Sequence, residues 1–171
     1  MIITGGKYKG RKIKTPDENI TRPTLSKVRQ GVFNTLYSLI GDFENKTFLD
    51  VFGGSGVMGL EALSRGFSDT LVFEKNPKVA QIITKNYETL GLKPNLKIGD
   101  SLKLLSGLVE RFDVIYVDPP YFSGIYEEVL KKIPEAEIVV VEHSTPFDLI
   151  GYELIKEKNY GGKKVSFLTK S

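Results

Sequence analysis

The sequence predicts an α/β fold with a mostly parallel sheet, and three observations lead to this prediction. Short apolar runs alternate with amphipathic segments along most of the chain, as in proteins whose parallel strands are covered by helices on both faces. The run Ile138-Val139-Val140-Val141 is apolar throughout, which indicates a central strand with no face toward solvent. Near the end, two strand-like segments flank Tyr160-Gly161-Gly162, which indicates an antiparallel hairpin.

The spacing of apolar residues places each element in turn. Residues 2–4 and 12–14 are short strand candidates around a glycine-rich turn, so we expect a small N-terminal hairpin. Helical spacing predicts a helix over 24–40, with Thr24 as its N-cap and Gly41 at its end. Strands of the main sheet are expected at 47–52, 70–73, 96–98, 113–117 and 137–141. Helices are expected at 57–65, 77–90, 101–108 and 124–133, and the final hairpin at 152–158 and 163–169.

Length and composition indicate one globular domain over residues 1–171, with 1–40 as a basic N-terminal extension and 41–171 as the core. The chain has 40% hydrophobic and 26% charged residues, which is ordinary for a globular protein. It contains no cysteine, which excludes disulfides and thiolate metal sites, and we expect no bound metal. No apolar run approaches the ~20 residues needed to span a bilayer. The first residues do not read as a signal peptide, so we expect a cytoplasmic protein without membrane contact.

Positive charge is concentrated in the N-terminal extension. Residues 1–40 hold eight basic and two acidic residues, whereas the remainder holds 16 basic and 19 acidic residues. A basic arm on a mildly acidic body suits a partner that carries phosphates, although a solvated, Lys-rich terminus is the alternative. Arg22 and Arg29 either grip phosphates or pair with carboxylates of the body. The expected phosphate contacts are Lys7, Lys9, Arg11, Lys12, Arg22 and Arg29.

Acidic residues stand at the ends of successive expected strands. Asp50, Glu74 and Asp100 come at or just after the first three strands, and Asp118 follows the fourth. In open α/β sheets, ligands bind beyond the carboxyl ends of the strands. Glu74 lies 24 residues after Asp50, near the ~20-residue offset of a carboxylate that binds ribose hydroxyls. Each residue alone has an ordinary structural explanation, but their joint placement predicts a nucleoside site.

The loop that follows the first strand, Asp50-Val51-Phe52-Gly53-Gly54-Ser55-Gly56, is rich in glycine. Glycines permit a tight turn and a close approach of ligand to backbone, and the next helix presents its N-terminal amides there. The same residues fit a plain tight loop, and Gly54-Ser55-Gly56-Val57-Met58-Gly59 also matches the dinucleotide pattern. The glycine pattern alone therefore does not separate a methyl donor from a nicotinamide cofactor.

Asp118-Pro119-Pro120-Tyr121 directly follows the apolar run of residues 112–117. Prolines have no amide hydrogen, so this loop is stiff and rich in acceptors. The Asp118 carboxylate and the Pro119 carbonyl could accept hydrogen bonds from the exocyclic amine of a base, a poor nucleophile that needs orientation. Tyr121 could stack on the base, an interaction worth ~1–3 kcal/mol. The loop has no role in hydride transfer, so it favours methyl transfer, with a simple loop terminator as the alternative.

The combined pattern is the layout of Rossmann-like class I methyltransferases that use S-adenosylmethionine. Glu74 would bind the ribose hydroxyls, and Asp100-Ser101 could accept from the adenine amine and cap the next helix. Asp50 could engage the ammonium group of the methionine portion directly or through water. The predicted donor site is Asp50, Phe52, Gly53, Ser55, Gly56, Glu74, Asp100 and Ser101, and the predicted catalytic loop is Asp118, Pro119, Pro120 and Tyr121.

The chain resembles the RsmD family of bacterial 16S rRNA (guanine-N2)-methyltransferases. The matching stretches run from Ile2-Ile3-Thr4-Gly5-Gly6 and Lys9-Gly10-Arg11-Lys12, through Arg22-Pro23-Thr24, Val28-Arg29 and Phe33-Asn34, to the glycine loop, Gly59-Leu60-Glu61-Ala62-Leu63-Ser64-Arg65-Gly66, Asp118-Pro119-Pro120-Tyr121 and Val141-Glu142. The N-terminal group is more specific than the glycine loop, which many methyltransferases share. The chain departs from the family pattern at Gly54, where alanine is usual, and at Ser26-Lys27, where Asp-Arg is usual.

The resemblance implies methyl transfer from S-adenosylmethionine to the N2 amine of one guanine in 16S rRNA. It implies a small ribosomal subunit or an assembly intermediate as the substrate, with ribosomal proteins as further partners. The residues by themselves leave three alternatives open: methylation of adenine N6 or another amine in DNA or RNA, a non-catalytic RNA-binding module, and a nicotinamide oxidoreductase.

Overall fold

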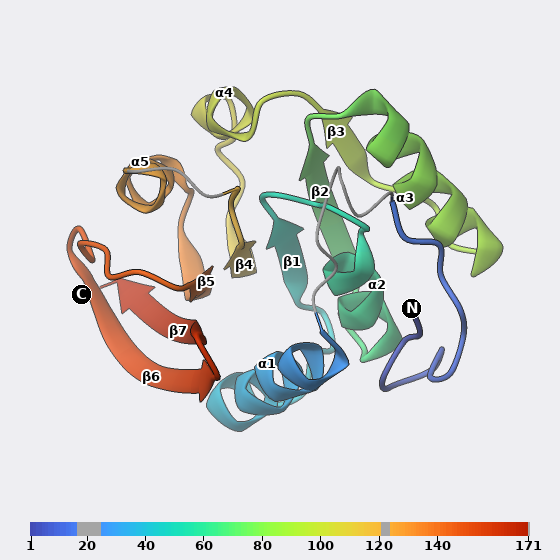
Figure 1. Cartoon of the computed structure of the whole chain (residues 1–171), viewed down its shortest axis with the longest axis horizontal. Helices are drawn as coiled ribbons and strands as arrows, with labels where there is room; N and C mark the ends of the chain where they lie inside the picture. The colour runs from blue at the N-terminus through green and yellow to red at the C-terminus, as the bar shows by residue number, and fades with distance from the viewer. Residues whose placement is uncertain (17–24, 121–123, 171) are drawn as a thin grey trace.

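The computed structural model of the chain describes residues 1–16, 25–120 and 124–170, and this part forms a seven-stranded sheet with helices on both faces (Figure 1). The strand order is β3-β2-β1-β4-β5-β7-β6. The five parallel strands are β1 (Thr47–Asp50), β2 (Asp69–Glu74), β3 (Leu96–Ile98), β4 (Phe112–Val117) and β5 (Ala136–His143). The strands β6 (Tyr152–Tyr160) and β7 (Lys163–Lys170) form the antiparallel hairpin beside β5. The predicted mostly parallel sheet with a final hairpin is confirmed.

The helices divide between two apolar clusters, one on each face of the sheet. Helices α1 (Ser26–Ile40), α2 (Val57–Ser64) and α3 (Pro77–Thr89) pack on one face. Helices α4 (Ser101–Ser106) and α5 (Ile125–Lys132) pack on the other (Figure 1). Residues 114–117 of β4 enter the two clusters alternately, as the two-residue period of a strand requires. The sheet is therefore covered on both faces, which explains why its central strands read as continuous apolar runs.

One helix start has a side-chain cap and another does not. Asn76 caps α3 by accepting hydrogen bonds from Lys78 N at 2.9 Å and Val79 N at 3.4 Å, and Pro77 at the first helical position has no amide to satisfy. Helix α1 begins differently from our expectation. Its N-cap is Leu25, which makes no side-chain cap, and the expected cap Thr24 lies outside the described residues. Gly41, with φ of 78°, ends α1 as expected.

The N-terminal extension packs into the core rather than lying on its surface. The expected hairpin is reduced to one antiparallel bridge between Ile2 and Lys12, with Ile3 and Ile13 buried in the same cluster as α1 and α2. Gly6 has φ of +78°, and a Cβ there would lie 1.9 Å from the carbonyl oxygen of Ser64. A glycine is therefore required where the extension crosses the end of α2.

A buried ion pair fixes α1, α2 and the extension together. Glu61 Oε1 lies 2.8 Å from Arg29 Nη1 and also accepts from the backbone N–H of Thr4 at 2.6 Å. Glu61 Oε2 pairs with Arg65 at 3.1 Å, and Arg29 donates to the carbonyl of Ile2 at 2.8 Å. Burial lowers the pKa of Arg29, and the charge of Glu61 opposes that change. The sequence pattern contains both partners but does not show that they meet.

Arg29 is 1% exposed, so the structure corrects its assignment as a phosphate contact. Of the two alternatives, pairing with a body carboxylate is the one found. Arg22 lies outside the described residues.

In the part of the chain that the structure describes, no helix is both long and apolar enough to cross a membrane.

Replacing Glu61 by Ala should lower the free energy of unfolding by about 3–5 kcal/mol, because Arg29 is left buried without its carboxylate. Urea unfolding followed by circular dichroism measures the change. Glu157→Ala is the matched control, because it breaks an exposed pair with Lys164 and should cost less than about 1 kcal/mol. Equal losses in the two variants would contradict a buried network that holds the extension.

Candidate donor and substrate site

Parallel pairing brings the predicted acidic residues to one edge of the sheet. Strand β1 lies between β2 and β4, and Asp50 is paired in register with Val72 and Tyr116. Glu74 and Asp118 follow these partners by two residues, so all three side chains come from adjacent strand ends. Asp100 lies beyond β3, where it caps α4 by accepting from Lys103 N at 3.1 Å, as expected. The carboxyl edge is where ligands bind in sheets of this kind.

Asp50 is a buried carboxylate with unsatisfied acceptors. It is 1% exposed, and neither side-chain oxygen has a hydrogen-bond partner among the described residues. Burial raises the pKa of Asp50 well above its usual value, and the negative charges of Asp118, Glu74 and Glu142 raise it further. The backbone N–H of Phe52 opposes this rise in the pKa of Asp50, although it makes no hydrogen bond to either carboxylate oxygen. A cationic donor group beside Asp50 would relieve both the desolvation and the repulsion.

The charge at this edge fits S-adenosylmethionine. Its sulfonium and ammonium groups are cationic, whereas a nicotinamide dinucleotide would bring the negative pyrophosphate toward the same carboxylates. Asp50, with its unpartnered oxygens, would hold the ammonium group, and Glu74 and Asp100 would face the nucleoside. The sequence identified Asp50, Glu74 and Asp118 from their strand-end positions, but it gave no role to Glu142 beyond the end of a strand.

The glycine loop is held by Glu74 and by close packing. Gly53 N donates to the Phe73 carbonyl at 2.7 Å, and Gly54 N donates to Glu74 Oε1 at 3.0 Å. The other oxygen of Glu74 accepts from Asn76 N at 2.9 Å. Each carboxylate oxygen has a second lone pair, so these bonds leave Glu74 able to accept from ribose hydroxyls. A Cβ at Gly53 would lie 2.5 Å from Val72 Cγ1, so this glycine is required by the protein's own packing.

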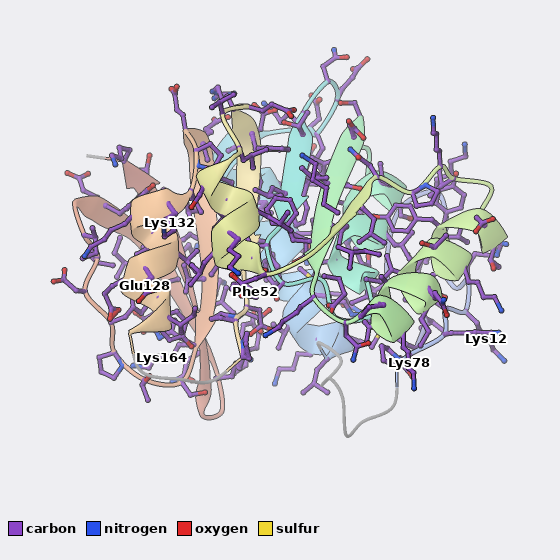
Figure 2. The ribbon with its side chains drawn as sticks, turned by 90° about the horizontal axis from the view of Figure 1, so that it is seen from above. Lys12, Phe52, Lys78, Glu128, Lys132 and Lys164 are labelled. Carbon is purple, nitrogen blue, oxygen red and sulfur yellow. The ribbon has the colours of Figure 1, made fainter. Side chains whose placement is uncertain are left out.

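The two predicted serines tie the loop to its neighbours through their hydroxyl groups. Ser55 Oγ accepts from Val57 N at 3.3 Å, and Ser101 Oγ donates to the Val51 carbonyl. Both residues are buried. Their hydroxyls therefore hold the glycine loop from inside the protein. Phe52 is half-buried and lies near the middle of the view in Figure 2.

Asn86 links the N-terminal extension to the glycine loop. Its Oδ1 accepts from Lys14 N at 2.8 Å, and its Nδ2 donates to the carbonyls of Lys14 at 2.8 Å and Ser55 at 3.3 Å. Asn86 is only 2% exposed, and it lies within α3, far from either segment in the sequence. Sequence reasoning missed this residue, because an asparagine within a helix carries no local signal of a distant contact.

The predicted catalytic loop begins at Asp118, which contacts the ammonium group of Lys163 in the hairpin. Asp118 Oδ1 lies 3.3 Å from Lys163 Nζ, and Glu142 Oε1 lies 3.5 Å from the same atom. Burial raises the pKa of Asp118, and the charge of Lys163 lowers it in part. Burial lowers the pKa of Lys163, but attraction to Asp118 and Glu142 more than compensates and raises it overall. Pro119 is half-buried and Pro120 exposed, whereas Tyr121 lies outside the described residues.

The other predicted phosphate contacts that the structure describes face solvent. Lys7, Lys9, Arg11 and Lys12 are all exposed, as a phosphate contact requires. Arg11 Nη2 donates to the carbonyl of Thr89 at 3.2 Å, which ties the extension to the end of α3. Figure 2 shows Lys12 on the same side of the view as Lys78, and Lys132 and Lys164 on the opposite side.

His143 is a structural residue in β5. Its Nδ1 lies 3.0 Å from the carbonyl oxygen of Thr145 and therefore donates, while Nε2 lies 2.7 Å from Ser166 Oγ. Burial lowers the pKa of His143, which favours the neutral imidazole. Phe147 packs against it edge-on at a centroid distance of 4.8 Å. These contacts join β5 to β7 and to the loop that follows β5.

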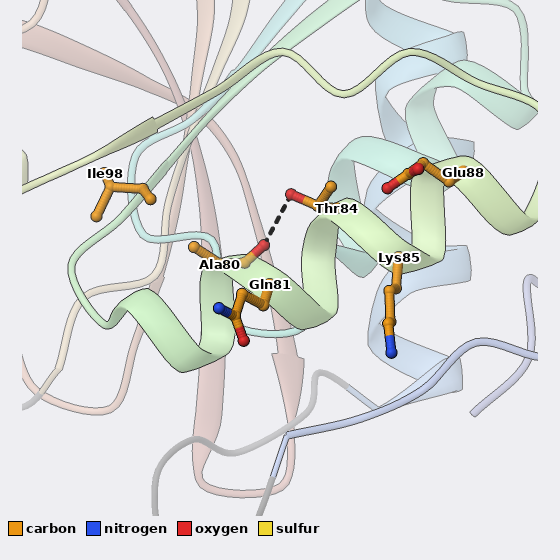
Figure 3. Close-up of a pocket in the computed structure, with 6 residues that line it drawn as sticks. All are labelled: Ala80, Gln81, Thr84, Lys85, Glu88 and Ile98. Carbon is orange, nitrogen blue, oxygen red and sulfur yellow. Dashed lines mark hydrogen bonds between the residues drawn. The ribbon is translucent and has the colours of Figure 1, made fainter.

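A shallow hollow of about 300 Å³ lies between α3 and the edge strand β3 (Figure 3). None of its lining residues belongs to the predicted donor or catalytic residues; they are Ala80, Gln81, Thr84, Lys85, Glu88 and Ile98. The hollow is therefore distinct from the charged edge.

Comparisons with known proteins agree with this geometry. A family model described as "Conserved hypothetical protein 95" matches residues 1–169. "Ribosomal RNA small subunit methyltransferase D" of Escherichia coli (strain K12) is 35% identical, over 93% of this chain and 84% of the relative. The chain belongs to the RsmD family. An RsmD relative of the same name from Haemophilus influenzae is 30% identical over 93% of this chain and 88% of its own length.

The fold agrees as well. A solved structure of the Escherichia coli protein yhhF covers 100% of this chain and 98% of its own, with a TM-score of 0.83 and 27% identity. The prediction of a Rossmann-like methyltransferase fold and that of an RsmD-family chain are both confirmed.

Gly53→Ala should destabilise the protein by about 1–3 kcal/mol, because the added Cβ would be forced against Val72 and the Phe73 carbonyl. Gly107→Ala is the control. It has φ of −97° and only one atom near the added Cβ, at 3.9 Å, so its stability should stay within about 1 kcal/mol of wild type. Urea denaturation measures both variants, and a Gly53→Ala protein as stable as the control would refute the packing requirement.

Proposed function

We propose that this RsmD-family protein transfers a methyl group from S-adenosylmethionine to the exocyclic N2 amine of a guanine in 16S rRNA of the small ribosomal subunit. The observation that carries the proposal is the parallel pairing of β1 with β4, in which Asp50 lies opposite Tyr116, two residues before Asp118. This pairing supports a donor contact and an amine acceptor close to one another, and the negative charge of Asp118 raises the pKa of Asp50. Relatives named for small-subunit rRNA methylation support the assignment of the substrate.

The substrate side of the reaction needs an acceptor at a fixed position. The amine lone pair of guanine is delocalised into the ring, so attack on a methyl group requires the nitrogen to become pyramidal. The Asp118 carboxylate and the Pro119 carbonyl accept hydrogen bonds from the amine, orient it, and stabilise the positive charge that develops on it. The sequence gives Tyr121 the role of stacking on the base. A base in folded RNA must leave its stack to reach this position.

The donor side is assigned to the glycine loop and its carboxylates. S-adenosylmethionine supplies an electrophilic methyl group on a sulfonium whose departure needs no acid. Asp50 would bind the ammonium group, Glu74 would accept from the ribose hydroxyls, and Asp100 would accept from the adenine amine. Phe52, Gly53 and Gly56 would form the loop around the donor, and Ser55 and Ser101 hold that loop in shape.

The decisive experiment incubates the protein with labelled S-adenosylmethionine and small subunits from a strain that lacks its gene. We expect label on one guanine of 16S rRNA, identified as N2-methylguanosine by mass spectrometry and then mapped. Label on adenine N6 would replace the proposal with adenine methylation. Absence of both transfer and calorimetric binding of S-adenosylmethionine would instead leave a non-catalytic RNA-binding module.

Asp118→Ala should reduce turnover on small subunits by at least about 100-fold. The variant lacks the carboxylate that accepts a hydrogen bond from the amine and stabilises its developing positive charge in the transition state. Calorimetry should show S-adenosylmethionine binding within a few-fold of wild type. Asp113→Asn, at the far end of the same strand, is the matched control and should keep full turnover. Turnover by Asp118→Ala equal to that of the control would reject the mechanism.

Combined replacement of Lys7, Lys9 and Lys12 by Ala should weaken binding to small-subunit RNA and reduce the slope of log K against log salt by about 2. Substitution is preferable to truncation, because Ile3 and Ile13 belong to the core. A triple variant of exposed lysines elsewhere, Lys131, Lys132 and Lys156, provides the charge-matched control. The same slope in both triple variants would mean that the extension does not contact phosphates.

A further inference from the structure

Lys163 joins two carboxylates that come from different strands. Its Nζ lies 3.3 Å from Asp118 Oδ1 at the end of β4 and 3.5 Å from Glu142 Oε1 near the end of β5. Lys163 is the first residue of β7, directly after the hairpin turn at Gly161-Gly162. The antiparallel hairpin thus places the ammonium group of Lys163 at the carboxyl edge of the parallel strands.

The position of Lys163 is set by contacts of the hairpin. Tyr160, on the other side of the turn, packs against the backbone of α1, because a Cβ at Gly31 would lie 1.8 Å from the Tyr160 hydroxyl oxygen. On the opposite side, Val165 pairs in register with Glu142. The turn is held between α1 and β5. The ammonium group of Lys163 therefore reaches Asp118 and Glu142 from a strand whose position is fixed.

Glu142 has one carboxylate oxygen that is still able to accept a hydrogen bond. Its side chain is 2% exposed, and its Oε2 has no hydrogen-bond partner among the described residues, while Oε1 faces Lys163. A buried carboxylate oxygen is costly to leave without a donor, so this atom favours a ligand that brings one. The Lys163 ammonium has three donors, enough for both carboxylates and one further acceptor.

These groups match the Watson–Crick edge of guanine. Guanine presents two neighbouring donors, N1–H and the N2 amine, beside the acceptor O6. Adenine presents the acceptor N1 beside the N6 amine, and cytosine presents the acceptor N3 beside the N4 amine. Two carboxylates and an ammonium therefore complement guanine, whereas a carboxylate placed against N1 of adenine or N3 of cytosine would face a lone pair.

We propose that Glu142 and Lys163 select guanine at this site, with Glu142 accepting from N1–H and Lys163 donating to O6 while Asp118 accepts from the N2 amine. The inference rests on the proposed function, because it names the residues that recognise the base whose amine is methylated. Hydrogen bonds to charged groups are among the stronger ones in proteins, so this recognition should separate guanine from analogues that keep the N2 amine.

The test keeps the N2 amine of the base and changes the other groups on its Watson–Crick edge. Small subunits are reconstituted with RNA carrying either guanine or 2,6-diaminopurine at the position mapped for the wild-type protein. Diaminopurine keeps the N2 amine but replaces N1–H by an acceptor and O6 by an amine. The ratio of kcat/KM for the two substrates is measured for wild type, Glu142→Gln and Lys163→Met.

We expect wild type to prefer guanine by about tenfold to a hundredfold, and each variant to lose most of that preference as its guanine rate falls. Glu137→Gln on the same strand and Lys164→Met on the same hairpin are the matched controls, and both should keep the wild-type ratio. Calorimetric binding of S-adenosylhomocysteine checks that each variant is folded. If Glu142→Gln does not fold, the ratio measured for Lys163→Met tests the proposal alone. The Lys163 side chain is 40% exposed, so we expect that variant to fold.

The outcomes separate the two proposals. Wild-type transfer to guanine with no preference over diaminopurine, or with a preference that both folded variants retain, overturns the assignment of Glu142 and Lys163 alone. Failure of wild type to methylate guanine in any small subunit overturns the proposed function, and the assignment with it.

Discussion

Buried negative charge at one edge of the sheet is the constraint on which this site depends. Parallel strands end at the same edge, so carboxylates that follow them are forced together. Asp50 and Glu142 are almost fully buried there, and Asp118 lies close enough to raise the pKa of Asp50. Such an arrangement is unfavourable for the protein alone unless cations compensate it. The described residues supply Lys163 to Asp118 and Glu142, while Asp50 has no such partner, so this edge is suited to a cationic donor.

The N-terminal extension is connected to this edge through the core. Glu61 and Arg29 fix its first residues to α1 and α2, and Asn86 joins Lys14 to the carbonyl of Ser55 in the glycine loop. A movement of the extension would therefore act on buried hydrogen bonds that also hold the glycine loop. Through this connection, the proposed contacts of the basic residues with RNA would influence the proposed donor site.

The final hairpin has a function beyond closing the sheet. Its two strands shield β5, and its turn returns Lys163 to the carboxylates while Tyr160 packs on α1. Helix α1 is the last part of the N-terminal extension, so Tyr160 joins the hairpin turn to that extension. The residues proposed to bind the donor follow β1, β2 and β3, whereas those proposed to hold the base come from β4, β5 and β7.

The sequence by itself determined the order of elements, the parallel sheet with its hairpin, and the strand-end positions of Asp50, Glu74, Asp100 and Asp118. These features depend on local periodicity and on the rule that parallel strands end together, so a linear pattern contains them. Only the tertiary structure decided that Arg29 is buried against Glu61 and that Ser55 and Ser101 direct their hydroxyls inward. It also brought Asn86 and Lys163 to the site. Contacts between residues dozens of positions apart depend on how helices and strands pack, and no local pattern encodes that distance.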